Sequence, residues 1–223
     1  MRDTSSSSGF AARARQLFGS AVHLIRERRQ VYLSLNLAYY GTVAMAMVFV
    51  ASHPTIQQAL TASVVLSFSE GPLAPVAGAY SEGNLLGAAV LTFVVNFFPG
   101  TLLVLLAPSL LIPFGGIALG LVRAALWGLL LAPTTPELQL AMIPHSLTLV
   151  LEGQGYVLAM FAAWVHGQAF LAPGSIGASS HWRGWAAGLR RSLRVYVLVA
   201  ATLAIAAVYE AFEVIYLVPR LIG

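Results

Sequence analysis

The sequence predicts an all-α fold, a polytopic transmembrane helix bundle with about five spans. Apolar residues make up 58% of its 223 residues and charged residues only 9%, whereas soluble domains carry roughly 25% charged residues. Several apolar runs are also long enough to cross the ~30 Å hydrocarbon core of a bilayer. Together these features exclude a soluble domain, because so little polar surface could not cover so many apolar residues.

The remaining composition limits the kind of partner and the kind of chemistry. The net charge is +4, and its arginines gather near the N-terminus and before the last apolar run, so the charge indicates membrane orientation. We therefore expect the lipid bilayer, and no nucleic acid, as a partner. The chain has no Cys, which excludes disulfides, thiolate nucleophiles and Cys-based metal sites.

The N-terminal region, 1–30, is predicted to be a cytoplasmic tail followed by an amphipathic helix. Residues 1–9 are polar and Ser-rich and are expected to be disordered. In 10–29, apolar residues recur at helical spacing beside arginines, which indicates a helix with one apolar face. This helix either lies on an anionic membrane surface or packs against the rest of the protein.

The rest of the chain, 31–223, is predicted to form a single transmembrane domain. Its apolar runs place the spans at 31–51, 85–107, 114–131, 142–171 and 195–218. A span needs about 20 residues because a helix rises about 1.5 Å per residue.

The connections between these spans also carry signals. Ile56, Leu60, Val64 and Phe68 lie four residues apart, which favours a short helix resting in the outer interface. Prolines and glycines in 108–116 predict a tight turn between the second and third spans. The basic, Gly/Ser-rich segment 172–194 is interpreted as the connection before the fifth span.

The arginines orient the bundle. Six precede the first span and four precede the fifth, whereas the loops after the first and third spans contain none. By the positive-inside rule, the N-terminus is expected in the cytoplasm and the C-terminus outside, in the cytoplasmic membrane of a bacterium or archaeon.

The fourth segment, 142–171, is predicted to be broken or re-entrant. Pro144 suits the first turn of a helix, because proline has no amide hydrogen to donate. Gly153 and Gly155 follow within the same run, and we expect the helix to break or kink there. Irregular backbone at this depth is tolerated only where protein or water covers it.

Six polar residues are placed at bilayer depth: Asn96, Arg123, His145, Glu152, Glu210 and Glu213. The first five form a predicted intramembrane polar cluster. Each is costly unless it has a partner. Glu152 and Glu210 are expected at similar depths within reach of Arg123, so a buried Arg–carboxylate pair is predicted. This pair either locks the helices together or forms a site for a substrate headgroup or a proton.

The same residues do not form an enzyme signature. His145, Glu152 and His166 lack the H-E-x-x-H spacing of zinc peptidases. Ser146 adjoins His145, but adjacent residues on a helix point apart and cannot form a dyad. We expect no catalytic, cofactor-binding or metal-binding residues and no enzymatic activity.

The run Ile143-Pro144-His145, followed by Glu152 and by Gly155-Tyr156-Val157-Leu158-Ala159, resembles the signature of the stage II sporulation protein M family. The similarity extends to Asn96, to the turn at Phe114-Gly115-Gly116 and to Glu210, and it covers 85–218. This resemblance implies a small membrane protein with about five spans, acting as a non-catalytic anchor and organiser of other envelope proteins.

Two functions follow from these observations. The first is a membrane scaffold that forms a homo-oligomer and recruits membrane or envelope proteins; Gly116 and Gly120 form a G-x-x-x-G pair suited to close helix contact. The alternative is a transporter or permease-like subunit in which Arg123, Glu152 and Glu210 line a pathway. The two differ in whether the polar residues face a cavity or a closed, paired interior.

Overall fold

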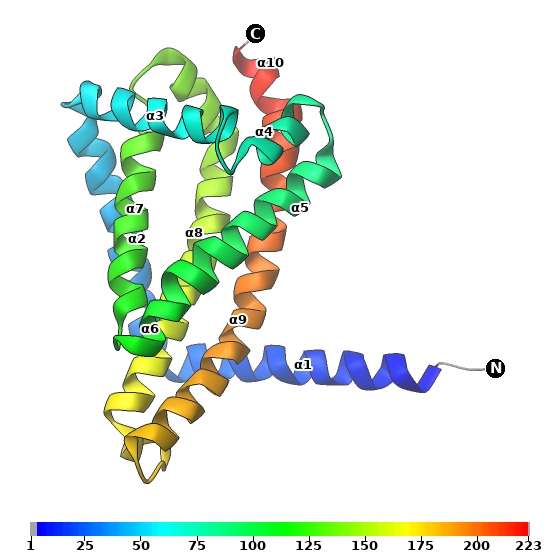
Figure 1. Ribbon diagram of the computed structural model, residues 1–223, viewed down its shortest axis with the longest axis vertical. Coiled ribbons are helices and arrows are strands. Elements are labelled where there is room, and N and C mark those ends of the chain that lie inside the picture. The colour runs from blue at the N-terminus through cyan, green and yellow to red at the C-terminus, as the bar shows by residue number, and fades with distance from the viewer. Residues whose placement is uncertain (1–3, 223) are drawn as a thin grey trace.

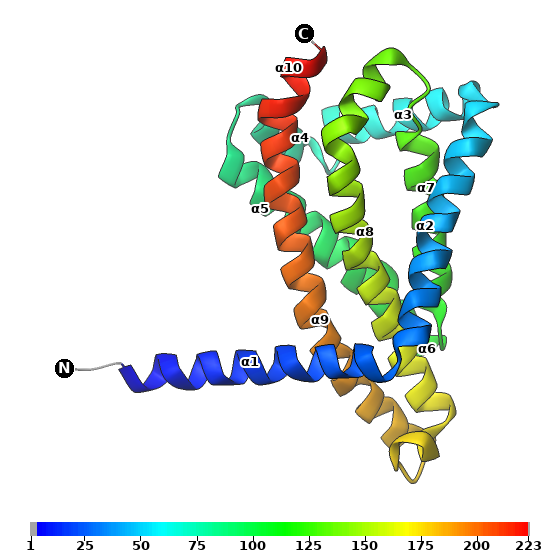
Figure 2. The same cartoon turned by 180° about the vertical axis from the view of Figure 1, so that it is seen from behind.

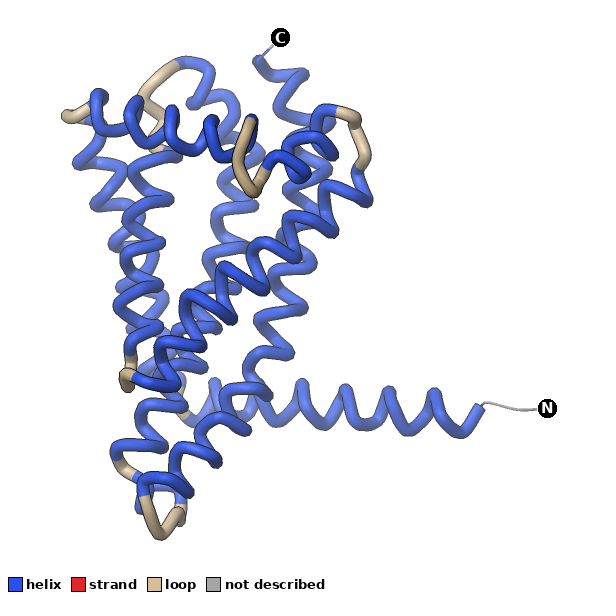
Figure 3. Tube along the Cα trace, in the orientation of Figure 1, coloured by secondary structure: helices blue, strands red, loops and turns tan. Residues whose placement is uncertain are grey.

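The computed structural model describes the fold of residues 4–222 and the side-chain surroundings of residues 15–222. Within this part the chain is helical almost throughout and contains no strand, which confirms the predicted all-α class. Loops are short and lie at the ends of the helices (Figure 3). Four helical segments are long and apolar enough to cross a membrane, or five if a bent helix pair counts as one span. The protein is therefore built as a multi-pass membrane helix bundle.

Successive segments run back and forth between the two ends of the bundle (Figures 1 and 2). In chain order these are α2 (Arg29–Ala51), the continuous segment of α5 (Leu85–Val95), π-helical η1 (Asn96–Leu106) and α6 (Ala107–Leu111), then α7 (Gly115–Leu131), α8 (Pro136–Leu171) and α9 (His181–Phe212). The helix α2 begins near one end of the bundle, and the C-terminal helix α10 lies at the other (Figure 1).

The N-terminal helix α1 (Thr4–Glu27) lies across the bundle rather than along it (Figure 1). Its last turns pack on α9, with Ala21 fully buried, whereas its beginning extends away from the other helices. The helix starts at Thr4, within the segment 1–9 that the sequence predicted to be disordered; residues 1–3 lie outside the described part of the chain. Serine is only slightly less favourable in a helix than most polar residues, which lets the helix run through the Ser-rich stretch.

The helices α3 (Pro54–Ser69) and α4 (Ala74–Ser81) lie at the end of the bundle opposite α1 and meet at an angle of 80°. The short helix predicted over 56–68 is thus present. Gln57 on α3 is buried and donates to the carbonyls of Leu130 and Ala132, at 3.0 and 2.9 Å. These carbonyls belong to the last turn of α7 and its C-cap, where no helical amide can reach them, so α3 caps α7.

The fourth segment is not broken. The helix α8 runs without interruption through Pro144, Gly153 and Gly155, so the predicted break at these residues is wrong. The glycines instead allow close packing: a Cβ on Gly153 would lie 2.7 Å from the Tyr40 hydroxyl, and one on Gly155 would lie 2.5 Å from a Leu203 methyl. A helix surrounded by neighbours tolerates glycine because the packing holds the backbone.

The last two helices are longer than predicted. The helix α8 begins at Pro136 and α9 begins at His181, so only a short stretch with the 3-10 helix η2 (Pro173–Ile176) connects them, and the connection predicted over 172–194 is mostly helical. The C-terminal helix continues through η3 (Glu213–Leu217) and α10 (Val218–Ile222). This α8–α9 hairpin projects beyond the level of α1 (Figure 2).

A stripe of small residues on α7 faces its neighbours: Gly116, Gly120, Ala124 and Gly128 are all buried. A Cβ on Gly120 would overlap Met160 of α8, and one on Gly128 would overlap the backbone of α2. The predicted G-x-x-x-G contact is therefore used inside the chain, as close packing of membrane helices requires.

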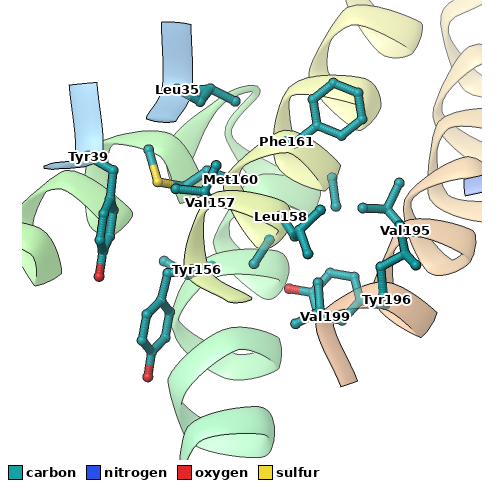
Figure 4. Packing of buried hydrophobic residues seen from close by; sticks show 14 of the residues in the cluster. Leu35, Tyr39, Tyr156, Val157, Leu158, Met160, Phe161, Val195, Tyr196 and Val199 are labelled. Carbon is teal, nitrogen blue, oxygen red and sulfur yellow. The ribbon is translucent and has the colours of Figure 1, made fainter. Parts of the chain in front are cut away.

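The core lies where α8 meets α2, α9 and η1. Its largest side chains include Tyr39, Tyr156, Met160 and Phe161, all inaccessible to solvent. Figure 4 shows the hydroxyls of Tyr39 and Tyr156 pointing the same way, away from Phe161; their rings stack at 6.4 Å. The core thus turns polar on one side of Tyr156.

Candidate functional site: a polar pocket within the bundle

One face of α8 carries the polar residues of the site. His145, Thr148, Glu152 and Tyr156 follow each other at intervals of three or four residues, so their side chains lie on the same side of the helix. Thr148, Glu152 and Tyr156 are buried. The uninterrupted helix holds these groups in one row, which a broken segment would not do.

Asn96 connects α8 to the neighbouring helices. Its Nδ2 donates to Oε1 of Glu152, and its Oδ1 accepts from the Tyr156 hydroxyl at 2.9 Å. The residue begins η1, where the helix widens; Pro99, three residues on, lacks the amide hydrogen that would bond the Val95 carbonyl. Wide helical turns of this kind are frequent at functional sites.

Arg123 of α7 reaches the same group of residues. It donates to Oδ1 of Asn96 at 3.2 Å and to the Tyr156 hydroxyl, and its guanidinium lies 4.2 Å from the centre of the Tyr156 ring. Among the described residues it has no carboxylate partner within 4.0 Å, so the predicted direct Arg–carboxylate pair is wrong. The Asn96 amide stands between the two charges because it can accept from one and donate to the other.

A second polar contact lies further along α8. His145 Nδ1 is 2.5 Å from Oε1 of Glu213, and the Thr148 hydroxyl donates to the same oxygen at 2.9 Å. Glu213 is completely buried. His145 is therefore the partner of a carboxylate that the predicted cluster did not include.

Three charged side chains of this region carry a buried atom that has no hydrogen-bond partner among the described residues. The atoms are Nε of Arg123, Oε2 of Glu210 and Oε2 of Glu213. Buried polar groups in proteins nearly always have a partner, so each exception needs an explanation. Two of the three side chains, Arg123 and Glu210, line a cavity.

This cavity has a volume of about 430 Å³. All five residues of the predicted polar cluster line it, namely Asn96, Arg123, His145, Glu152 and Glu210. The structure therefore brings residues from η1, α7, α8 and α9 to one place. Side chains of α3, α4 and α5 complete the wall, and most of them are apolar.

The opposite side of α8 carries a separate polar cluster that faces α2. The Tyr32 hydroxyl donates to Gln154 Oε1 at 2.6 Å, and Gln154 Nε2 donates to Asn36 Oδ1 at 2.7 Å and to the Tyr40 hydroxyl at 3.0 Å. The Tyr40 hydroxyl in turn donates to the Val150 carbonyl at 2.8 Å. These bonds are closed among themselves, and none of these side chains lines the cavity of about 430 Å³.

Sequence reasoning missed several residues of the site: Thr148 and Tyr156, together with the pocket-lining Tyr80 and Trp127. Glu213 was placed at bilayer depth but was left out of the predicted cluster. Tyr156 could have been found, because it lies one helical turn after Glu152. Tyr80 could not, because it enters through α4, whose position depends on the bend after α3. Its hydroxyl lies 2.9 Å from that of Thr92 in the pocket wall.

Comparisons with protein-family models, with curated proteins and with solved structures found no match to this chain.

Proposed function

We propose that this protein is a permease-like membrane subunit that binds a small solute within the bilayer and passes it across. The observation that carries the proposal is the cavity of about 430 Å³ lined by Asn96, Arg123, His145, Glu152 and Glu210. Its size lies within the range of ordinary small-molecule sites. The activity proposed is non-enzymatic.

The state of the polar groups supports a binding site over a structural lock. Ionisable residues inside a membrane usually mark a pathway for a substrate, an ion or a proton. A cluster that only joined helices would satisfy all its members, as the Gln154 cluster does on the other side of α8. Arg123 and Glu210 instead keep unpartnered atoms and border empty space.

The distribution of arginines supports a location in a bacterial or archaeal cytoplasmic membrane. The junction of α1 and α2, where Arg26, Arg28 and Arg29 lie in the sequence, and the first half of α9, which contains Arg190 and Arg191, are toward the same end of the bundle (Figure 1). We place this end in the cytoplasm and the C-terminus outside, following the positive-inside rule.

Access to the pocket from water tests the proposal, and the absence of cysteine makes single-cysteine labelling direct. Thr92→Cys places a thiol in the pocket wall, and Val90→Cys places one on the same helix at a lipid-facing position. Right-side-out and inside-out vesicles are treated with a membrane-impermeant methanethiosulfonate reagent. We expect the Thr92→Cys thiol to react from both sides and the Val90→Cys thiol from neither.

Each other outcome counts against the proposal. Reaction of the Thr92→Cys thiol from one side only would show a pocket that does not communicate across the membrane. No reaction from either side, in protein that elutes as a single species on size exclusion, would show a closed interior.

A second candidate is the non-catalytic scaffold typical of the stage II sporulation protein M family. The observation in its favour is α1, whose beginning extends from the bundle (Figure 2) and whose Leu17 and Phe18 are exposed. Such a helix offers a surface to membrane or envelope proteins, or to a second copy of the chain. Mass photometry in nanodiscs tests it: a strict monomer that captures no partner from its native membrane would exclude it.

A further inference from the structure

The charges in the pocket do not balance. Three charged side chains line it besides His145, which is already paired with Glu213: Arg123, Glu152 and Glu210. One is basic and two are acidic, which leaves a surplus negative charge when both carboxyls are ionised. An unbalanced charge at this depth is expensive, so a complementary positive charge would be favoured there.

The single basic group is already occupied. Arg123 donates to Asn96 and to Tyr156, and its guanidinium lies over the rings of Tyr156 and Trp127, at 4.2 and 5.5 Å. Glu152 is linked to this group through Asn96. The arginine is thus engaged with its own neighbours and is a poor anchor for an acidic ligand.

Glu210 is the carboxylate that remains. Its Oε2 is buried and has no hydrogen-bond partner among residues 15–222. It reaches the pocket from α9, whereas Arg123 reaches it from α7. When Glu210 is ionised, its negative charge is the one in the pocket that lacks a partner among the described residues.

The rest of the wall suits an apolar body. Most of the other lining side chains are aliphatic, and Phe68, Tyr80 and Trp127 add aromatic rings. Aromatic rings attract organic cations through their π-electrons, and the attraction grows when the cation is desolvated. A metal ion is a poor fit, because within the described part of the chain no three His, Asp or Glu residues are placed to hold one.

We propose that the ligand of this pocket is a small organic monocation with an apolar body, such as a protonated or quaternary amine, whose charge is received by Glu210. This inference rests on the proposed function and specifies its solute class. The carboxylate supplies the counter-charge, the aromatic wall supplies dispersion and cation–π contact, and the pocket excludes larger solutes by its volume.

The test uses labelled phenyltrimethylammonium, a permanent cation, and full-length protein in nanodiscs. We expect saturable binding that is not displaced by tert-butylbenzene, its neutral isostere, or by benzenesulfonate, an anion of similar size. Glu210→Gln should weaken binding at least about tenfold, because the amide keeps the shape and removes the charge. Glu82→Gln, at an exposed position, should bind as the native protein does.

A second measurement needs no change at Glu210. The Thr92→Cys thiol is treated with two methanethiosulfonates, the cationic trimethylammonium-ethyl and the anionic sulfonatoethyl reagent. The ratio of the cationic to the anionic reaction rate is then divided by the same ratio for Ser81→Cys, an exposed reference. We expect the pocket thiol to favour the cation by at least about tenfold, as for a site with uncompensated negative charge.

The outcomes separate the two proposals. Three results would contradict an organic cation as the ligand but not the proposed permease function. They are equal binding by Glu210→Gln, displacement by the neutral isostere, and a preference of the pocket thiol for the anionic reagent. A pocket thiol that reacts with neither reagent from either side would overturn both.

Discussion

Replacing Asn96 with leucine tests the arrangement at the centre of the site. Leucine has nearly the same size, but it removes the groups that accept from Arg123 and Tyr156 and donate to Glu152. Three hydrogen bonds are lost, and single side-chain bonds between membrane helices are worth roughly 0.6–1.7 kcal/mol each. We therefore expect the free energy of unfolding to fall by about 2–5 kcal/mol.

The measurement is equilibrium unfolding in mixed dodecylmaltoside–SDS micelles, followed by circular dichroism. Phe98→Leu is the matched control, because this residue is on the same helix and faces outward with 52% of its surface exposed. Its effect should stay within about 0.5 kcal/mol. A double-mutant cycle with Arg123→Met should give a coupling energy above about 0.5 kcal/mol. If Asn96→Leu unfolds like the Phe98 control, or if the cycle shows no coupling, Asn96 does not connect the charges.

Three further variants test the packing and the second polar contact by the same unfolding assay. Gln57→Leu removes both donors to the end of α7 and should cost about 1–3 kcal/mol; an unchanged stability would show that α3 does not cap α7. Gly128→Ala should cost about 1–3 kcal/mol, because a Cβ there meets the α2 backbone. Gly41→Ala, which meets nothing within 4 Å, should be neutral or slightly stabilising, and equal effects of the two would contradict the close contact. His145→Leu leaves the buried Glu213 carboxylate without its basic partner and should cost roughly 3 kcal/mol; a neutral result would mean that the contact carries no weight.

The sequence was sufficient for the architecture because hydropathy and turn residues act locally. The apolar runs predicted the spans, and the prolines and glycines of 108–116 predicted the turn, where Phe114 adopts a positive φ of 67°. The helix predicted over 114–131 is present as α7, but with 17 residues, about 25 Å, it is shorter than the helices long enough to cross a membrane. The side chain of Gln57 in α3 donates to the carbonyls at the end of this short helix and so satisfies them. No local sequence pattern predicts this contact.

The errors share a cause, which is that a residue's role depended on a neighbour from another helix. Gly153 and Gly155 were interpreted as helix breakers, a property of the chain alone, whereas Tyr40 and Leu203 fill the space beside them. Arg123 was assigned a carboxylate partner from depth alone. Asn96 could be placed at the same depth, but its position between the two charges depends on the packing of η1 against α7 and α8.

The two polar sides of α8 have different roles: one joins α8 to a neighbouring helix, and the other faces the pocket. The side with Gln154 forms a closed set of hydrogen bonds to Tyr32, Asn36 and Tyr40 of α2, so α2 and α8 are held as one body. The side with Glu152 faces the pocket, whose other walls come from α3, α4, α5, η1, α7 and α9. Any movement that opens the pocket must therefore take place between α8 and those walls, and not between α8 and α2. Only one residue of α3, Gln57, is buried. Of these walls, α3 is therefore the one held in place by the fewest buried residues.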